Sequence, residues 1–278
     1  MRRKQNRFRL SAGSASDRKG HDQFIEELEK LLFPPRCPVC DGILHVDEIR
    51  AGSRIHQECR KKLYPAAGPV CYHCGRPVTA PEAEYCYDCG CRLRKMESPY
   101  WKKTEPFSWF VQGKALYVYQ GAARKMMYRF KYANRREYAS FLAGRAVEEY
   151  GDWIRHTGVQ AVVPVPVFRG RQKKRGYNQA GLLAKQIAEL SGLAYEPEAL
   201  IRIRNTRPQK ELGDKERKNN LKSAFQAGDF VVKYRCILLV DDIYTTGATV
   251  EAAAQELRKA GVSDIYVLTI CIGMGINN

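Results

Sequence analysis

The sequence predicts an α/β fold with a mostly parallel, doubly wound sheet, preceded by a small cysteine-rich module. Eight of the ten cysteines fall between Cys37 and Cys91, a density typical of metal binding. After about Tyr100, short apolar runs typical of strands alternate with segments of helical periodicity. That alternation indicates a parallel sheet covered on both faces. With 278 residues, the chain can bury one sizeable core beside the smaller module.

The first segment, residues 1–30, is predicted to be a disordered basic tail with a lead-in helix. Its first twenty residues carry seven Lys or Arg side chains against one acid, Asp17, and the whole chain has a formal charge of +17. Such a charge attracts polyanions, nucleic acid above all, although it also serves solubility. An organelle transit peptide has a similar composition, but the tail lacks an amphipathic period.

No stretch of the sequence is long and apolar enough to span a bilayer. The opening residues also lack the apolar run of a secretory signal. We therefore expect a cytoplasmic protein, in which disulfides are rare because the compartment is reducing.

Four pairs of metal-binding side chains, each separated by two residues, make up the module at residues 31–95. Each pair suits a zinc knuckle, which supplies half of a tetrahedral site. Pairing them in order predicts two Zn²⁺ ions, one held by Cys37, Cys40, His56 and Cys59 and the other by Cys71, Cys74, Cys86 and Cys89. Four ligands leave no open position, so both ions are predicted to be structural, and the module to unfold without them.

Two ligands of this set have alternatives. His56 occupies a position where the other three pairs have a cysteine, and a lone histidine is often an ordinary surface or core residue. Cys91 lies two residues beyond Cys89 and could replace it. Cys236 and Cys271 lie in apolar runs and are interpreted as core residues.

The second domain, residues 100–278, is predicted from three strands and the helices between them. The expected order is one or two helices over Gly121–Tyr150, a strand over Ala161–Val167, a helix over Ala180–Leu190, a strand over Ile237–Val240, a helix over Val250–Ala260 and a strand over Ile265–Ile272. Ligands of such sheets bind beyond the carboxyl ends of the strands.

One such strand end carries the strongest signal in the chain, the stretch Ile237–Thr249, ILLVDDIYTTGAT. Threonine hydroxyls, backbone N–H groups and Gly247 at the start of a helix form an anion nest that suits a phosphate. The adjacent Asp241 and Asp242 would repel phosphate, so we expect them to face ribose hydroxyls, with help from Mg²⁺. The alternative is that these residues only cap a helix.

This stretch resembles the signature of the type I phosphoribosyltransferases, which bind 5-phosphoribosyl-1-pyrophosphate (PRPP). The resemblance implies a type I phosphoribosyltransferase-like fold, catalytic roles for the acidic pair, Asp241 and Asp242, and binding of the 5-phosphate by Thr245, Thr246, Gly247, Ala248 and Thr249. Zinc knuckles joined to this signature resemble the ComF family, from Cys37 onward. That likeness implies a partnership with single-stranded DNA and with the machinery of DNA uptake.

Further segments carry the same likeness. Val163–Pro166 and Arg175–Gln179 resemble the family's VPVP and RGFNQ stretches, with Tyr177 in place of phenylalanine, and Lys131 matches a family position. The basic run 169–175 suits a pyrophosphate loop, or is a solvated loop. The polar segment 204–225 resembles a mobile catalytic lid. Candidates to contact pyrophosphate, or to act from the lid, are Arg175, Asn178, Gln179, Gln209 and Arg217; Thr206, Asn220 and Phe225 also match the lid.

Three functions follow from these residues. An enzyme would displace pyrophosphate from PRPP, although the sequence indicates no acceptor. A DNA-binding protein would use the fold as a scaffold, and Tyr128, Phe130 and Tyr132, among Arg129 and Lys131, would stack bases unless they belong to the core. A regulator would bind PRPP without catalysis. Replacing the acidic pair by alanine separates the second function from the other two.

Overall fold

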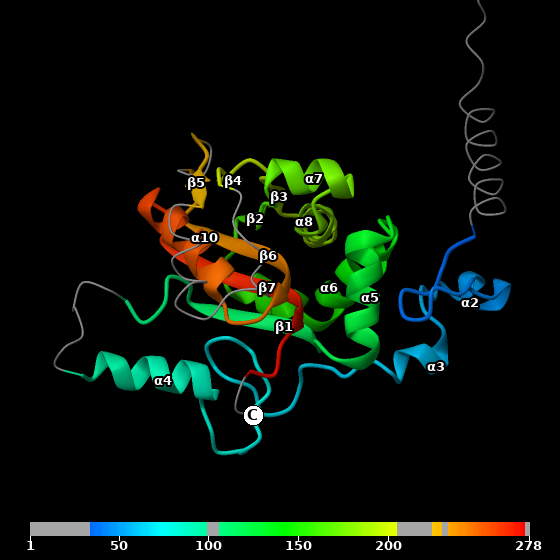
Figure 1. Ribbon diagram of the computed structural model, residues 1–278, viewed down its shortest axis with the longest axis horizontal. Coiled ribbons are helices and arrows are strands. Elements are labelled where there is room, and N and C mark those ends of the chain that lie inside the picture. The colour runs from blue at the N-terminus through cyan, green and yellow to red at the C-terminus, as the bar shows by residue number, and fades with distance from the viewer. Residues whose placement is uncertain (1–33, 99–105, 205–223, 230–232, 276–278) are drawn as a thin grey trace, which may run out of the picture.

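The computed structural model describes residues 34–98, 106–204, 224–229 and 233–275. Five parallel strands form its main sheet, with helices on both faces (Figure 1). The strand order is β1 (Gln112–Val118), β7 (Asp264–Ile272), β6 (Cys236–Tyr244), β2 (Ala161–Pro164) and β3 (Ala194–Tyr195). A separate antiparallel pair joins β4 (Leu200–Arg202) to β5 (Phe225–Ala227). The predicted parallel α/β fold is confirmed.

Two hydrophobic cores lie on the two faces of the sheet. On β6, Leu238 and Val240 pack toward one core and Ile237 and Leu239 toward the other, because successive strand residues face opposite sides. The first core contains the apolar faces of α5 (Gly121–Tyr132), α6 (Tyr138–His156) and α8 (Gln179–Ser191). The second contains α10 (Ala248–Lys259). Burial on both faces explains the apolar runs of β2 and of the first half of β6.

Within the described residues, every strand and helix predicted for the second domain is present, with some differences in detail. Residues 1–30, with the expected tail and lead-in helix, lie outside the described residues. The strand after residue 237 continues to Tyr244, so the acidic pair lies within β6. The segment 169–175, predicted as a loop, is the short helix α7 (Arg169–Arg175), which ends at Gly176 with a φ of 82°. Strand β1 was not predicted, because its sequence QGKALYV contains Gly and Lys and lacks a clear apolar run.

The zinc-ligand region contains three short helices, α2 (Val46–Arg50), α3 (Gln57–Arg60) and α4 (Tyr87–Met96). Its two halves contribute to different cores: the first predicted ligand set packs with the α5–α6 core and the second with the α10 core. Figure 1 shows α2 and α3 beyond α5, with α4 on the other side of the sheet. The first half therefore packs on one face of the sheet and the second half on the other.

The segment between the two halves covers the outer edge of β1. The Ala66 N–H donates to the Leu116 carbonyl at 3.0 Å, and the Val118 N–H donates to the Tyr64 carbonyl at 2.8 Å. Edge strands expose unpaired backbone groups that invite unwanted pairing. This segment satisfies those groups and attaches the cysteine-rich region to the sheet.

The topology places one edge of the sheet in position for a ligand. From β2 the chain moves outward to β3, whereas from β6 it moves in the opposite direction to β7. The reversal lies between β2 and β6, and ligands of open α/β sheets bind at the carboxyl ends of strands at such a point.

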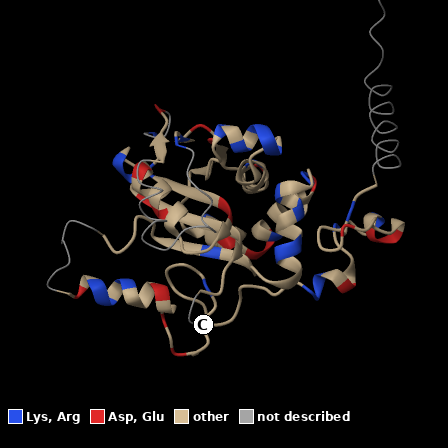
Figure 2. Cartoon of the chain, in the orientation of Figure 1, with Lys and Arg blue, Asp and Glu red and all other residues tan. Residues whose placement is uncertain are grey.

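Figure 2 shows basic residues along α5 and α7. Among the described helices, none is long and apolar enough to cross a membrane.

Candidate functional site

The acidic pair lies near the carboxyl end of β6, at the reversal point. The Lys131 Nζ, on α5, lies 2.8 Å from the Asp242 Oδ2, and these side chains are 20% and 14% exposed. The Asp241 carboxylate accepts a hydrogen bond of 2.8 Å from the Asp242 N–H. The pair is thus held in place by the sheet and by a cation from a neighbouring helix.

The electrostatics of the site depend on burial and on the closeness of its charges. Burial and the neighbouring Asp242 charge raise the pKa of Asp241 to about 7. Burial disfavours the charged form of Lys131, but the two carboxylates raise its pKa above the usual value. Burial and the nearby Arg171 lower the pKa of Arg202, on β4, to about 10. The site therefore brings two carboxylates together with cations from α5, α7 and β4.

Residues 245–249 span the turn after β6 and the first two residues of α10. Gly247 is the N-cap of α10 with a φ of 77°, and a Cβ there would meet the Tyr244 hydroxyl, with the ring Cζ at 2.6 Å. The buried Thr246 Oγ1 has no hydrogen-bond partner among the described residues. Free N–H groups and the helix dipole at such a terminus favour an anion. We call residues 245–249 the 245–249 turn.

Of the remaining predicted site residues, some lie on α10 and beside α5, and others lie outside the described residues. Ala248 and Thr249 form the first turn of α10, and Thr245 is exposed. The guanidinium of Arg175 lies 5.0 Å from the Tyr132 ring, at the same end of α5 as Lys131. Gln209 and Arg217, with Thr206 and Asn220, lie outside the described residues.

Asn178 and Gln179 contact backbone groups of neighbouring elements. The Asn178 Nδ2 donates to the Val165 carbonyl at 3.2 Å. Gln179 is 1% exposed, and its Nε2 donates to the Phe130 carbonyl at 3.5 Å. Tyr177 donates its hydroxyl hydrogen to the same carbonyl. These contacts join α8 to β2 and α5.

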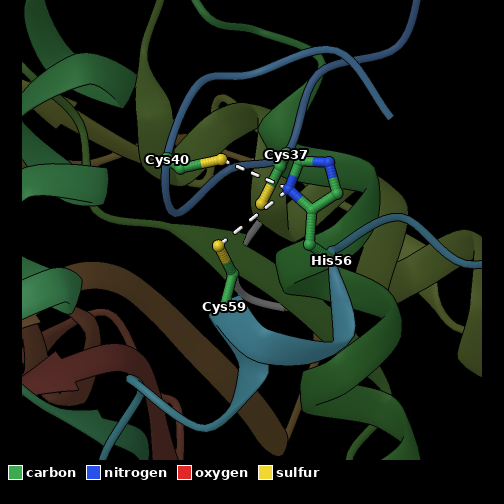
Figure 3. Close-up of side chains that lie close together, drawn as sticks. All are labelled: Cys37, Cys40, His56 and Cys59. Atoms are coloured by element: carbon green, nitrogen blue, oxygen red, sulfur yellow. Dashed lines mark hydrogen bonds between the residues drawn. The ribbon is translucent and has the colours of Figure 1, made fainter. Parts of the chain in front are cut away.

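The first predicted metal site is assembled as expected. The ligand atoms of Cys37, Cys40, His56 and Cys59 lie within 4.8 Å of one another, and their side chains point toward a common centre (Figure 3). The His56 Nδ1 lies 3.2 Å from the Cys40 Sγ and 3.9 Å from the Cys59 Sγ. The His56 Nε2 lies 3.0 Å from the Ile43 carbonyl, which must accept its hydrogen. That hydrogen bond leaves Nδ1 free to bind zinc.

The second site is more deeply buried. The sulfurs of Cys71, Cys74, Cys86 and Cys89 also lie within 4.8 Å of one another, and all four residues are buried. Cys91 is outside this group and receives a hydrogen bond from the Arg94 guanidinium at 3.1 Å. The structure therefore selects Cys89 over Cys91, because residues one helical turn apart face one side of α4 and Cys91 faces another. Both sets suit structural zinc.

Sequence reasoning missed Arg202 and Arg76. Arg202 lies beside the polar segment interpreted as a lid, and no spacing marked it. Arg76 is 2% exposed and donates from Nη2 to the Thr245 carbonyl at 2.6 Å, across 169 residues of sequence. Such a contact has no signal in a single sequence, because nothing local requires it.

The fold and the two metal sites define a class of protein: a parallel α/β domain joined to a double zinc ribbon. The family model for the double zinc ribbon domain matches residues 28–90. Competence protein F of Haemophilus influenzae is 30% identical over 241 residues, 85% of this chain and 96% of that protein. The chain belongs to the ComF family.

Other proteins are similar over shorter or more distant matches. The DNA utilization protein YhgH of Salmonella typhimurium is 32% identical, covering 73% of this chain and 83% of that protein. Competence protein ComFC of Bacillus subtilis is 28% identical, covering 81% and 89%. Among solved structures, the glutamine PRPP amidotransferase from B. subtilis matches with 21% identity and a TM-score of 0.31, covering 50% of this chain and 26% of that one.

Proposed function

We propose that the chain binds PRPP with Mg²⁺ at the carboxyl end of β6. The observation that carries the proposal is the acidic pair in β6 followed by the Gly247-capped start of α10. The N–H groups and threonine hydroxyls of the 245–249 turn bind the 5-phosphate, and the Thr246 hydroxyl gains a partner, which it lacks among the described residues. The acidic pair accepts hydrogen bonds from the ribose hydroxyls, directly or through Mg²⁺.

The cations around the acidic pair suit the pyrophosphate of the same ligand. Arg171 on α7 lies close enough to Arg202 on β4 to lower its pKa, so two positive charges share one region beside Asp241. A highly charged anion relieves that repulsion when it binds. Lys131 balances the acidic pair at the same time. We therefore assign these two arginines to the oxygens of the pyrophosphate and not to the ribose hydroxyls.

Phosphoribosyl transfer is the enzymatic form of this proposal. The bond between the anomeric carbon and the pyrophosphate oxygen breaks, pyrophosphate leaves with the electron pair, and an acceptor forms the new bond to carbon. The arginines would stabilise the leaving group, Mg²⁺ would supply further positive charge when bound, and the 245–249 turn would fix the phosphate at the other end of the sugar. Release of pyrophosphate in the presence of candidate acceptors tests this step.

The test of binding is a calorimetric titration of zinc-replete protein with PRPP and Mg²⁺. The variant Asp241→Ala with Asp242→Ala should lose binding. Asp264→Ala is the matched control, because Asp264 is exposed and begins β7, at the amino end of the parallel strands, whereas the acidic pair lies near their carboxyl end. Absence of binding by the unaltered protein, or equal binding by the acidic-pair variant, would contradict the proposal.

A second candidate function is binding of single-stranded DNA. The relatives are named for competence and DNA utilization, and we propose a cytoplasmic role in handling incoming DNA. Tyr128 and Tyr132 are 63% and 59% exposed, with ring centroids 5.0 Å apart, whereas Phe130 is fully buried. The guanidinium of Arg175 lies over the Tyr132 ring. Exposed aromatic rings beside cations are the means by which proteins stack bases.

Fluorescence anisotropy with a labelled oligothymidine tests the DNA candidate. Tyr128→Ala with Tyr132→Ala should weaken binding by at least tenfold, since each stacked base contributes about 1–3 kcal/mol. Tyr72→Ala with Tyr87→Ala is the control, because these tyrosines are also exposed but lie in the zinc-ligand region. The acidic-pair variant should keep its DNA affinity. Removal of residues 1–20 should flatten the salt dependence, and an unchanged slope would exclude a role for the tail.

A further inference from the structure

A single buried arginine joins the second metal site to the 245–249 turn. Arg76 follows the turn that contains Cys74, and its guanidinium has partners in both regions. Nη2 donates to the Thr245 carbonyl at 2.6 Å. Nη1 pairs with the Asp88 carboxylate and lies 4.0 Å from the Cys86 Sγ. Arg76 is therefore held at the metal site by the second ligand pair and reaches the turn from there.

This contact fixes the direction of one peptide group in the turn. The described peptide bonds include no cis bond, and in a planar trans peptide the carbonyl and the next N–H point in opposite directions. With the Thr245 carbonyl bound to Arg76, the Thr246 N–H faces away from the metal site. An N–H group fixed in advance is worth more to an anion than one that must be ordered on binding.

A second group of contacts holds the other side of Gly247. Glu251 lies in the first turn of α10 and pairs with Arg92 of α4. The Glu251 carboxylate also accepts hydrogen bonds from the Ser108 hydroxyl at 2.9 Å and from the Trp109 N–H at 3.0 Å. The second metal site and the segment after it thus hold both the peptide before Gly247 and the helix that follows.

Arg76 and its partner Asp88 lie beside different ligand pairs of the second metal site. Arg76 follows the pair Cys71 and Cys74, whereas Asp88 lies between Cys86 and Cys89. The turn that carries Cys71 and Cys74 packs directly against β1, since a Cβ on Gly75 would meet the Gly113 carbonyl oxygen at 2.6 Å. Zinc bound to all four sulfurs would join the segment that carries Asp88 to this turn.

We propose that Arg76 is a positioning residue for the 245–249 turn and that zinc in the second site sets the anion-binding geometry of the turn through it. The proposal rests on the proposed PRPP function for its ligand, but not for its structural claim. It assigns the second zinc ribbon a part in ligand binding.

The first experiment measures amide hydrogen exchange of zinc-replete, ligand-free protein in peptides covering residues 241–250. Arg76→Met should exchange about tenfold faster there, the effect of losing one charge-assisted hydrogen bond. Arg129→Met is the matched control, because the Arg129 Nη1 donates to the Val39 carbonyl at 2.8 Å beside the first metal site. Exchange in Arg76→Met equal to that of Arg129→Met would overturn the proposal.

Two further measurements keep the result interpretable. The zinc content of Arg76→Met, measured by mass spectrometry, should remain two ions per chain. If this variant loses an ion, Asp88→Asn tests the role of Arg76 instead. It removes only the partner that orients Arg76, and it should still speed amide exchange in residues 241–250. A PRPP titration should show at least tenfold weaker binding by Arg76→Met. If the unaltered protein does not bind PRPP, the proposed function fails, while the exchange data still decide the role of Arg76.

Discussion

The ion pair between Lys131 and Asp242 offers a sharp test of the site's electrostatics. At the Nζ–Oδ2 distance of 2.8 Å, an effective dielectric constant of about 20 gives an attraction of ~6 kcal/mol. The cost of desolvation offsets part of that energy. Breaking a buried pair by removing one partner typically costs about 3–5 kcal/mol. Because both side chains keep some exposure, we expect Lys131→Met to lower the free energy of unfolding by ~3 kcal/mol at pH 8.

The loss should shrink as the pH falls. Burial, with the Asp242 charge, already raises the pKa of Asp241 to about 7, and Lys131 is among the groups that lower it. Without Lys131 that pKa rises further above the value of 3.8 expected in the unfolded chain. The folded variant then holds a proton that the unfolded chain has released, so its stability increases as the pH falls through the folded pKa. At pH 5.5 the deficit should be clearly smaller than at pH 8.

Urea unfolding of zinc-replete protein at both pH values measures the two deficits. Lys61→Met is the control, because the Lys61 Nζ also lies 2.8 Å from a carboxylate, that of Glu58, but both side chains are largely exposed. The control should unfold like the unaltered protein. Equal deficits at pH 5.5 and pH 8, or equal destabilisation by the two variants, would refute the electrostatic reasoning.

Three other predictions concern the turn, the metal sites and the pH dependence of binding. Gly247→Ala should abolish PRPP binding and destabilise the fold by at least ~2 kcal/mol, since it adds a clash with Tyr244 to the strain of positive φ. Gly192→Ala should cost about 1 kcal/mol, because Gly192 has a φ of 67° but its added Cβ would meet no atom of the described residues within 4 Å. Similar unfolding curves for the two variants would contradict this account. Zinc analysis should find one ion fewer in Cys86→Ser and no loss in Cys91→Ser; an ion lost from the latter would restore Cys91 as a ligand. PRPP–Mg²⁺ affinity, corrected for titration of the ligand, should rise about tenfold from pH 6 to pH 8, because Asp241, with a pKa of about 7, must lose its proton to bind the metal; a flat calorimetric profile would argue against that role.

The sequence alone determined the local features of this protein. The two-residue spacing of the ligand pairs predicted both metal sites, because a knuckle is closed by residues a few positions apart. The order of apolar strands and periodic helices predicted the parallel sheet, and the string from Asp241 to Thr249 predicted a turn at a helix start. Each of these depends on neighbours in the chain, so a single sequence contains the signal.

The tertiary structure decided what lies beside these features. Lys131 pairs with Asp242 only because α5 packs on the face of the sheet next to β6. Cys89 rather than Cys91 joins the second site because α4 turns one of them inward. Arg76 reaches Thr245 because the two zinc ribbons separate onto opposite faces of the sheet. Contacts between residues far apart in sequence follow from packing, which no local pattern encodes.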